Sequence, residues 1–161
     1  MSGDIAMVTF PNPEKVSVSV FNLIQNKIDK KLPLLLYGLV KDCDRSYPQN
    51  SILKITMPGK NYDSQVEFGS FLSFNTKYSE NMLELYFNRP DHFPQDERFV
   101  PFGLTGNGDY FLFFYENGKQ DPEPKVYYWA HEYCDIDGGL VFLANSFVEF
   151  LDMLKPDGYY D

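Results

Sequence analysis

The chain contains very little cysteine: two residues, Cys43 and Cys134, in a sequence of 161. Two cysteines so far apart do not form the dense disulfide framework of a small secreted domain, and free thiols are typical of a reducing compartment. The N-terminus MSGDIAMVTFPNPEK also lacks the basic start and long apolar run of a secretory signal. We therefore expect a cytoplasmic protein whose two thiols stay reduced.

Long apolar runs and positive charge are also scarce. No segment approaches the roughly 20 apolar residues that span a bilayer. The chain has 14 Lys and Arg against 23 Asp and Glu, a net charge of −9. A protein that binds nucleic acid or an anionic membrane needs clustered basic residues, because these displace counterions. We expect neither to be a direct partner.

Apolar and aromatic residues, by contrast, are abundant. Hydrophobic residues make up 43% of the chain and aromatic residues 17%, including 15 Phe and 12 Tyr. This is enough apolar surface for a substantial core in one domain. Aromatic rings suit the pleated surface of a sheet, and no internal repeat or linker interrupts the sequence. We expect one domain of mixed α and β structure over residues 1–161.

Four segments have the pattern of helices. The first begins with the side-chain cap, preset φ and acidic residue of Asn12-Pro13-Glu14 and continues at helical spacing to Ile28. Two more are predicted from Leu34 to about Asp44 and from Ser79 to Phe87. The last follows Ser146–Glu149, a capping box in which each side chain satisfies the other residue's backbone N–H.

Strand-like segments fill the middle and the end of the chain. Their apolar and aromatic residues lie between turn signals such as Pro58-Gly59-Lys60-Asn61. The predicted strands are SILKIT (51–56), SQVEFGSFLSF (64–74), RFVPF (98–102), DYFLFFY (109–115), KVYYW (125–129) and GLVFLA (139–144).

The densest local signal is the stretch PFGLTGNGDYFLFF, residues 101–114, with three glycines in six positions: Gly103, Gly106 and Gly108. The first and last have the spacing of a P-loop, but Asp109 and Tyr110 stand where that loop needs Lys and Ser or Thr. A dinucleotide fingerprint from the middle glycine needs another glycine where Phe111 stands, and then a helix. The stretch instead predicts a strand-connecting turn with glycine at positive φ.

The motifs FVPFGLTGNGDYFLFFY, PKVYYWAHE and LANSFVEFLDML resemble, in this order, the SUKH superfamily, the Smi/Knr-like domain. That family has a Pro-Phe strand, a turn ending in Gly-Asp, an apolar strand, a Val-Tyr-Tyr-Trp-x-His-Glu strand and a Ser-Phe-x-Glu-Phe-Leu helix. Leu32-Pro33 resembles the start of its second helix, whereas Cys43-Asp44-Arg45-Ser46 replaces a frequent Asn-Gly-Gly. The residues that carry the resemblance are Pro101, Phe102, Gly106, Gly108, Asp109, Trp129, His131, Ser146, Phe147, Glu149, Phe150 and Leu151.

The resemblance implies an α+β fold, with a curved, mainly antiparallel sheet and helices packed on one side. It also implies a function. Bacterial members look like immunity proteins that bind and block a polymorphic toxin, frequently a nuclease, and eukaryotic members are regulatory interaction domains. Neither role is enzymatic. The alternatives are a regulatory or scaffold interaction domain, or a small ligand-binding domain or enzyme with an unrecognised site. A neighbouring gene for a large secreted toxin would favour immunity.

Few residues offer chemistry of their own. The segment from His131 to Cys134 contains zinc-type ligands, but a site needs three or four, and the only other His and Cys are His92 and Cys43. At a strand end, His131 is expected to hydrogen-bond the backbone. Neither cysteine has a cationic neighbour that would activate its thiol. Trp129 is expected in or near the core, and the alternative is an interface anchor. We predict no catalytic residue, metal or cofactor.

Acidic residues gather in the last quarter of the chain. Residues 121–161 hold nine Asp and Glu against Lys125 and Lys155 alone. Several lie in or beside the two loops that flank KVYYWAHEY, with Tyr133 as an aromatic neighbour, and we predict one negative rim that binds a basic toxin domain. The alternative is that the charge only keeps the protein soluble. The predicted partner-binding residues are Asp121, Glu123, Glu132, Tyr133, Asp135 and Asp137.

Overall fold

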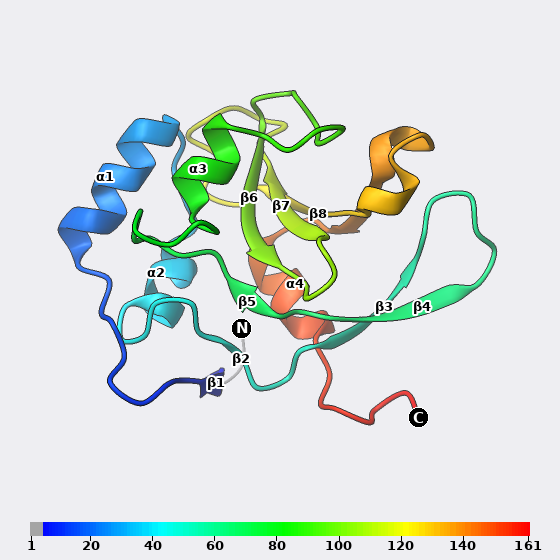
Figure 1. Ribbon diagram of the computed structural model, residues 1–161, viewed down its shortest axis with the longest axis horizontal. Helices are drawn as coiled ribbons and strands as arrows, with labels where there is room; N and C mark the ends of the chain where they lie inside the picture. Colours follow the sequence, from blue (N-terminus) through cyan, green and yellow to red (C-terminus); the bar gives the residue numbers. More distant parts are fainter. Residues whose placement is uncertain (1–4) are drawn as a thin grey trace.

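In the computed structural model, which describes residues 5–161, helices pack against a central antiparallel sheet (Figure 1). The helices are α1 (Val18–Ile28), α2 (Leu34–Val40), α3 (Met82–Phe87) and α4 (Phe147–Met153), with two 3-10 turns, η1 (His131–Tyr133) and η2 (Asp137–Gly139). The strands are β1 (Met7–Val8), β2 (Tyr47–Pro48), β3 (Ile52–Thr56), β4 (Asp63–Glu67), β5 (Ser70–Phe71), β6 (Phe99–Leu104), β7 (Tyr110–Phe114), β8 (Lys125–Trp129) and β9 (Leu140–Ala144). The predicted α+β class is confirmed.

The central sheet has the strand order β5-β6-β7-β8-β9, and each neighbouring pair is antiparallel. Because β6 to β9 are consecutive in the chain, turns and loops at alternate ends of the sheet connect them. β3 and β4 form a separate hairpin. Two backbone hydrogen bonds between Ile52 and Lys155, of 2.8 and 2.9 Å, tie the base of this hairpin to the segment after α4.

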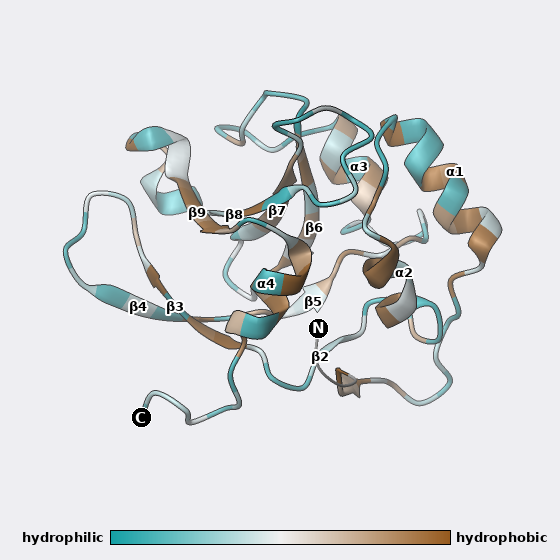
Figure 2. Cartoon of the chain, turned by 180° about the vertical axis from the view of Figure 1, so that it is seen from behind, coloured by the Kyte–Doolittle hydropathy of each residue, from teal (hydrophilic) through white to brown (hydrophobic). Residues whose placement is uncertain are grey.

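The side chains of β7 alternate between two cores, as the two faces of a strand require. Phe111 and Phe113 enter the larger core, whereas Leu112 enters a smaller one that contains Phe93 and Trp129. Trp129 is only 3% exposed, so the expectation that it is a core residue is confirmed. Figure 2 shows the hydrophobic strands at the centre of the molecule.

All four helices contribute buried side chains to the larger core, and none contributes to the smaller one. The predicted arrangement, with helices on one side of the sheet, is therefore confirmed. The longest of them, α1, has 11 residues. Within residues 5–161, no helix has the length and apolar character to cross a bilayer.

The starts of two helices differ from the prediction. α1 begins at Val18, because the Ser17 side chain accepts a hydrogen bond from the Val20 N–H and caps it. Asn12, the predicted cap, instead has a φ of +53° in the preceding segment. α3 begins at Met82, because the Asn81 side chain accepts a hydrogen bond from the Glu84 N–H and caps the helix. In both cases a nearer side-chain cap determines the start.

The segment from 64 to 74 is not one strand. It divides into β4, which pairs with β3, and β5, which pairs with β6. The chain changes partners at Gly69, whose N–H donates to the Leu104 carbonyl at 2.8 Å. A Cβ at this glycine would lie 2.9 Å from the same oxygen, so only glycine permits the approach. α2 is also shorter than predicted and ends at Val40, before a turn.

The start of α4 agrees with the predicted capping box in one of its two bonds. The Ser146 hydroxyl accepts from the Glu149 N–H at 3.2 Å. The Glu149 carboxylate reaches one residue further back than predicted and accepts from the Asn145 N–H at 2.8 Å. Both bonds still satisfy backbone donors near the helix start. Phe147, Phe150 and Leu151 are buried beneath the sheet as the inward stripe.

Candidate functional site

The glycine-rich stretch forms the turn between β6 and β7, as predicted. The Thr105 N–H donates to the Asp109 carbonyl at 3.0 Å and closes the turn. Among its three glycines only Gly108 has a positive φ, +95°. Gly103 lies inside β6, where a Cβ would come within 2.4 Å of the Phe68 ring. Close packing, not turn geometry, therefore requires glycine at that position.

Asp109, at the end of this turn, is a buried carboxylate that makes three contacts with two residues. Its Oδ1 atom accepts from the His131 N–H at 2.9 Å and lies 2.5 Å from His131 Nδ1. Its Oδ2 atom accepts from the Tyr128 hydroxyl. Burial, together with this hydrogen bond, raises the pKa of Tyr128 above its ordinary value, so the phenol remains a donor. The expectation that His131 bonds the backbone is wrong for its ring, which contacts this side chain instead.

The bonds to Asp109 fix one end of the loop between β8 and β9, and a glycine fixes the other. The Ala130 N–H donates to the Gly139 carbonyl at 2.8 Å, which brings the two ends of the loop together. A Cβ on Gly139 would lie 2.6 Å from the Ala130 carbonyl oxygen. The loop, which contains η1 and η2, is therefore closed at its base by contacts that tolerate little change.

The β8–β9 loop projects from the molecule, at the right of Figure 1 in orange. Glu132, Asp135 and Asp137 are all exposed on it, and the Ile136 side chain of the same loop is 38% exposed. Ile136 also rests on the tip of the β3–β4 hairpin, where a Cβ on Gly59 would lie 2.9 Å from its Cδ1 atom. Three of the predicted acidic residues thus lie exposed in one loop that also carries an exposed apolar side chain.

Asp121 and Glu123 do not join this group. They lie in the loop before β8, whereas the β8–β9 loop follows the same strand. A strand of five residues spans about 17 Å, so the two loops occupy opposite ends of β8. The prediction of one continuous negative rim is therefore wrong, although each loop is acidic by itself. Tyr133, expected as an aromatic contact, is partly buried against the larger core.

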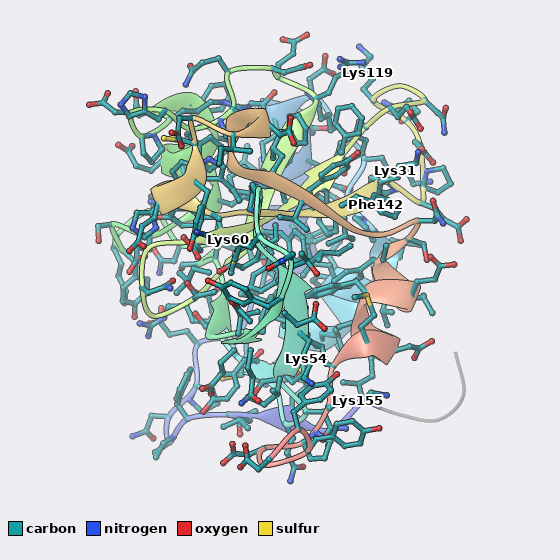
Figure 3. The ribbon with its side chains drawn as sticks, turned by 90° about the vertical axis from the view of Figure 1, so that its right-hand side faces the viewer. Lys31, Lys54, Lys60, Lys119, Phe142 and Lys155 are labelled. Carbon is teal, nitrogen blue, oxygen red and sulfur yellow. The ribbon has the colours of Figure 1, made fainter. Side chains whose placement is uncertain are left out.

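Positive charge lies close to the acidic loop on one side. The Lys60 ammonium is 5.7 Å from the centre of the Tyr133 ring. Figure 3 shows this side of the molecule, which also presents Phe142 of β9 with an exposed fraction of 47%. The lysines labelled there are Lys31, Lys54, Lys60, Lys119 and Lys155. One lysine, Lys60, therefore lies beside the acidic β8–β9 loop.

The residues considered as metal ligands or nucleophiles lie apart. Cys43 is buried and Cys134 is half-buried, and both are free thiols. His92 is exposed in the segment before β6, and the His131 ring is directed at Asp109. Within the described part of the chain, residues 5–161, no three His, Cys, Asp or Glu side chains are grouped closely enough to hold a metal ion.

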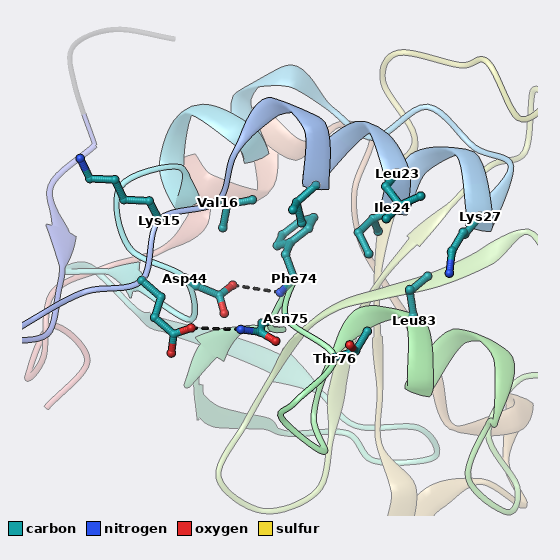
Figure 4. Close-up of a pocket in the computed structure, with 12 residues that line it drawn as sticks. Lys15, Val16, Leu23, Ile24, Lys27, Asp44, Phe74, Asn75, Thr76 and Leu83 are labelled. Carbon is teal, nitrogen blue, oxygen red and sulfur yellow. Dashed lines mark hydrogen bonds between the residues drawn. The ribbon is translucent and has the colours of Figure 1, made fainter.

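A groove that the sequence analysis did not predict runs beside α1 (Figure 4). Its volume is about 370 Å³. At its floor the buried Asp44 carboxylate accepts from the Phe74 N–H at 2.9 Å and from the Ser73 hydroxyl at 2.5 Å. The apolar residues that line the groove are Val16, Val20, Leu23, Ile24, Phe74 and Leu83. Exposed apolar residues on α1 beyond its core stripe are the sequence signal that could have indicated it.

Glu14 also lines the groove and contacts the segment before α3. Its carboxylate accepts from the Tyr78 hydroxyl and from Asn75 Nδ2 at 3.0 Å, and it lies 3.2 Å from the Lys77 ammonium. The hydrogen bonds from Tyr78 and then Lys77 hold the pKa of Glu14 below its usual value. This carboxylate is therefore engaged within the protein.

A model of the SMI1 / KNR4 family (SUKH-1) matches residues 15–153 of the chain. The matched segment begins shortly before α1 and ends at the last residue of α4, so it includes every helix and the whole central sheet. The Asp109 bonds and the β8–β9 loop lie within it. Comparison with curated proteins gives no match.

Proposed function

Because the chain belongs to the SMI1 / KNR4 family (SUKH-1), we propose that it is a cytoplasmic, non-enzymatic protein-binding domain that neutralises a cognate toxin. The observation that carries this proposal is the projecting β8–β9 loop. It presents Glu132, Asp135 and Asp137 to solvent on the same loop as the half-exposed Ile136. Protein interfaces combine apolar and charged contacts in this way.

The charge of the loop suits a basic partner. A toxin that acts on nucleic acid must itself present basic residues, because it binds phosphates. Three exposed carboxylates attract such a surface during diffusional encounter and then occupy its phosphate-binding positions. Steering of this kind raises an association rate above the unsteered ~10⁵–10⁶ M⁻¹s⁻¹, by about 10- to 1,000-fold at low salt.

The shape of the loop is fixed before a partner arrives. The Asp109 bonds to His131 hold its first residue, and the contact between Ala130 and Gly139 holds its last. A preorganised contact surface loses little conformational entropy on binding, so more of the interaction free energy appears as affinity. The proposed contact is therefore the β8–β9 loop alone, without Asp121 and Glu123.

The first test is the association rate with whichever toxin domain the neighbouring genes encode, measured over a range of ionic strengths. The variant replaces Glu132, Asp135 and Asp137 by their amides. It should fold as the wild type does, because exposed charges contribute little to stability. Its association should be about tenfold slower or more at low salt and should depend less on salt concentration.

A matched control removes the same charge from the opposite end of the sheet. Glu97, Asp121 and Glu123 are replaced by their amides, which changes the net charge equally but leaves the β8–β9 loop intact. This control should associate at close to the wild-type rate. Equal slowing in both triple variants would show that only net charge matters, and wild-type rates in both would place the interface elsewhere.

A further inference from the structure

One flank of α1 carries a stripe of side chains that the core does not use. Val20, Leu23 and Lys27 recur at i, i+3 and i+7, so they lie on one side of the helix. Val20 is 37% exposed and Leu23 is 51% exposed. The buried stripe of the same helix consists of Phe21, Ile24 and Ile28. The exposed stripe borders the groove shown in Figure 4.

The opposite wall of the groove belongs to a different part of the chain. Phe74, and Leu83 of α3, provide apolar surface there, with Thr76 between them (Figure 4). The groove volume of about 370 Å³ is within the range of ligand sites. Val20 and Leu23 also expose apolar surface along its rim, which a helix laid along α1 would cover.

The free charges at the groove are positive. Lys15 and Lys27 lie toward its two ends in Figure 4, and neither forms an ion pair with any residue of the described range 5–161. The carboxylates at the groove are engaged: Asp44 bonds Ser73 and Phe74, and Glu14 bonds the segment before α3. A local positive character therefore exists in a chain whose net charge is −9.

We propose that this groove binds an amphipathic α-helix of a protein partner. Apolar side chains of that helix, at i, i+3 or i+4, and i+7, would enter between α1 and α3, with an acidic side chain toward Lys15 and another toward Lys27. The 11 residues of α1 provide about 16 Å of contact length, roughly three helical turns. This inference rests on the proposed protein-binding function and adds a second contact surface to it.

A second copy of the chain fits the groove less well. A symmetric contact would place the stripe of one α1 against the same stripe of the other, and it would bring Lys15 and Lys27 of one copy close to the same residues of its partner. Like charges at a contact oppose association. An acidic helix instead complements both lysines.

The test uses two synthetic helical peptides of about 15 residues, each with leucines at i, i+3, i+4 and i+7. One has a glutamate at each end and the other a lysine at each end. The glutamate peptide, titrated into the full-length protein, should shift the amide resonances of Val20, Leu23 and Leu83. It should bind about tenfold or more tightly than the lysine peptide at low salt.

Two matched substitutions separate the groove from the rest of the helix. Leu23→Gln should weaken binding of the glutamate peptide about tenfold or more, because a partly buried apolar anchor is lost. Val18→Gln, at a 58% exposed position on the other side of α1, should leave binding unchanged. Replacing Lys15 and Lys27 by glutamate should reverse the preference between the two peptides.

The proposal is overturned if the shifted resonances lie outside the groove, if the two glutamine variants bind equally, or if no binding occurs at millimolar peptide. Concentration-dependent dimerisation of the protein alone, lost in Leu23→Gln, would assign the groove to a second copy and also overturn it. The peptides do not involve the β8–β9 loop, so these results are independent of the toxin-association test.

Discussion

Among single residues, Asp109 has the most consequences for the proposed site. It follows the turn glycine Gly108, it is 4% exposed, and its carboxylate accepts hydrogen bonds from Tyr128 and from the first residue of η1. A buried carboxylate is tolerated only when its oxygens have such partners. The motif that ends in Gly-Asp is thus a structural device that positions the acidic loop.

Removal of one donor tests this role. Tyr128→Phe leaves Asp109 Oδ2 buried without its hydroxyl partner, so we expect the free energy of unfolding to fall by about 1–3 kcal/mol. Tyr127→Phe is the control, because its side chain is half-exposed on the neighbouring position, and it should change stability by less than about 0.5 kcal/mol. Chemical denaturation measures both, and equal effects would contradict the role given to Asp109.

Two glycines of the β6–β7 region offer a second comparison. Gly103→Ala would place a Cβ 2.4 Å from the fully buried Phe68 ring, and overpacking of this kind costs about 1–3 kcal/mol. Gly106→Ala has no heavy atom within 4 Å of the new Cβ and should be close to neutral. Thermal unfolding measures the stability of both variants. A Gly103→Ala variant as stable as the wild type would mean that β6 or the Phe68 ring moves to accommodate the Cβ at no cost, and would contradict this prediction.

At the scale of elements, the sequence predicted the central strands better than the helix starts. The segments that became β6, β7, β8 and β9 combine aromatic residues with clear turn signals, and both properties are local. The start of α1 was misplaced because Asn12 and Ser17 both have capping side chains, and tertiary contacts select between them. Val16 packs in the core, and its N–H bonds the Lys41 carbonyl, which holds the chain extended before the helix.

The candidate sites were predictable only where they are local. Glu132, Asp135 and Asp137 lie within one short loop, so their proximity follows from the sequence. Asp121 and Glu123 are separated from them because successive loops of an antiparallel sheet lie at opposite ends of the sheet. The groove beside α1 was not predictable in this way, because its walls come from segments about 50 residues apart that meet only in the folded chain.

The contacts of Glu14 with Tyr78 and Lys77 predict that the stability of the fold depends on pH. Hydrogen bonds from Tyr78 and Lys77 lower the pKa of Glu14 in the folded protein below 4.5, its ordinary value. The stabilisation is therefore fully present above the unfolded pKa and is lost as the pH falls through the folded pKa. Glu14→Gln should lower the melting temperature at pH 7, and its difference from wild type should shrink on acidification below about pH 4.5. A difference that stays constant or grows in acid would contradict this assignment.

For the whole molecule, the net charge of −9 conceals an uneven distribution. The β8–β9 loop is acidic, the side shown in Figure 3 carries several lysines, and the groove beside α1 has two more at its ends. One partner could therefore contact the acidic loop with basic residues and the groove with an acidic helix. Specificity would then depend on both signs of charge, which a solubility role for the charge does not require.

The most direct test of the central claim is a titration of toxin activity with the purified protein. The toxin is sought among the genes beside this one, and its activity is measured at increasing molar ratios of this protein. A non-enzymatic domain that neutralises by binding should reduce activity linearly to zero at an equimolar ratio when both concentrations exceed Kd. Inactivation by a small fraction of an equivalent would indicate catalysis, and full activity at a large excess would show that the toxin is not the partner. Either result would contradict the account.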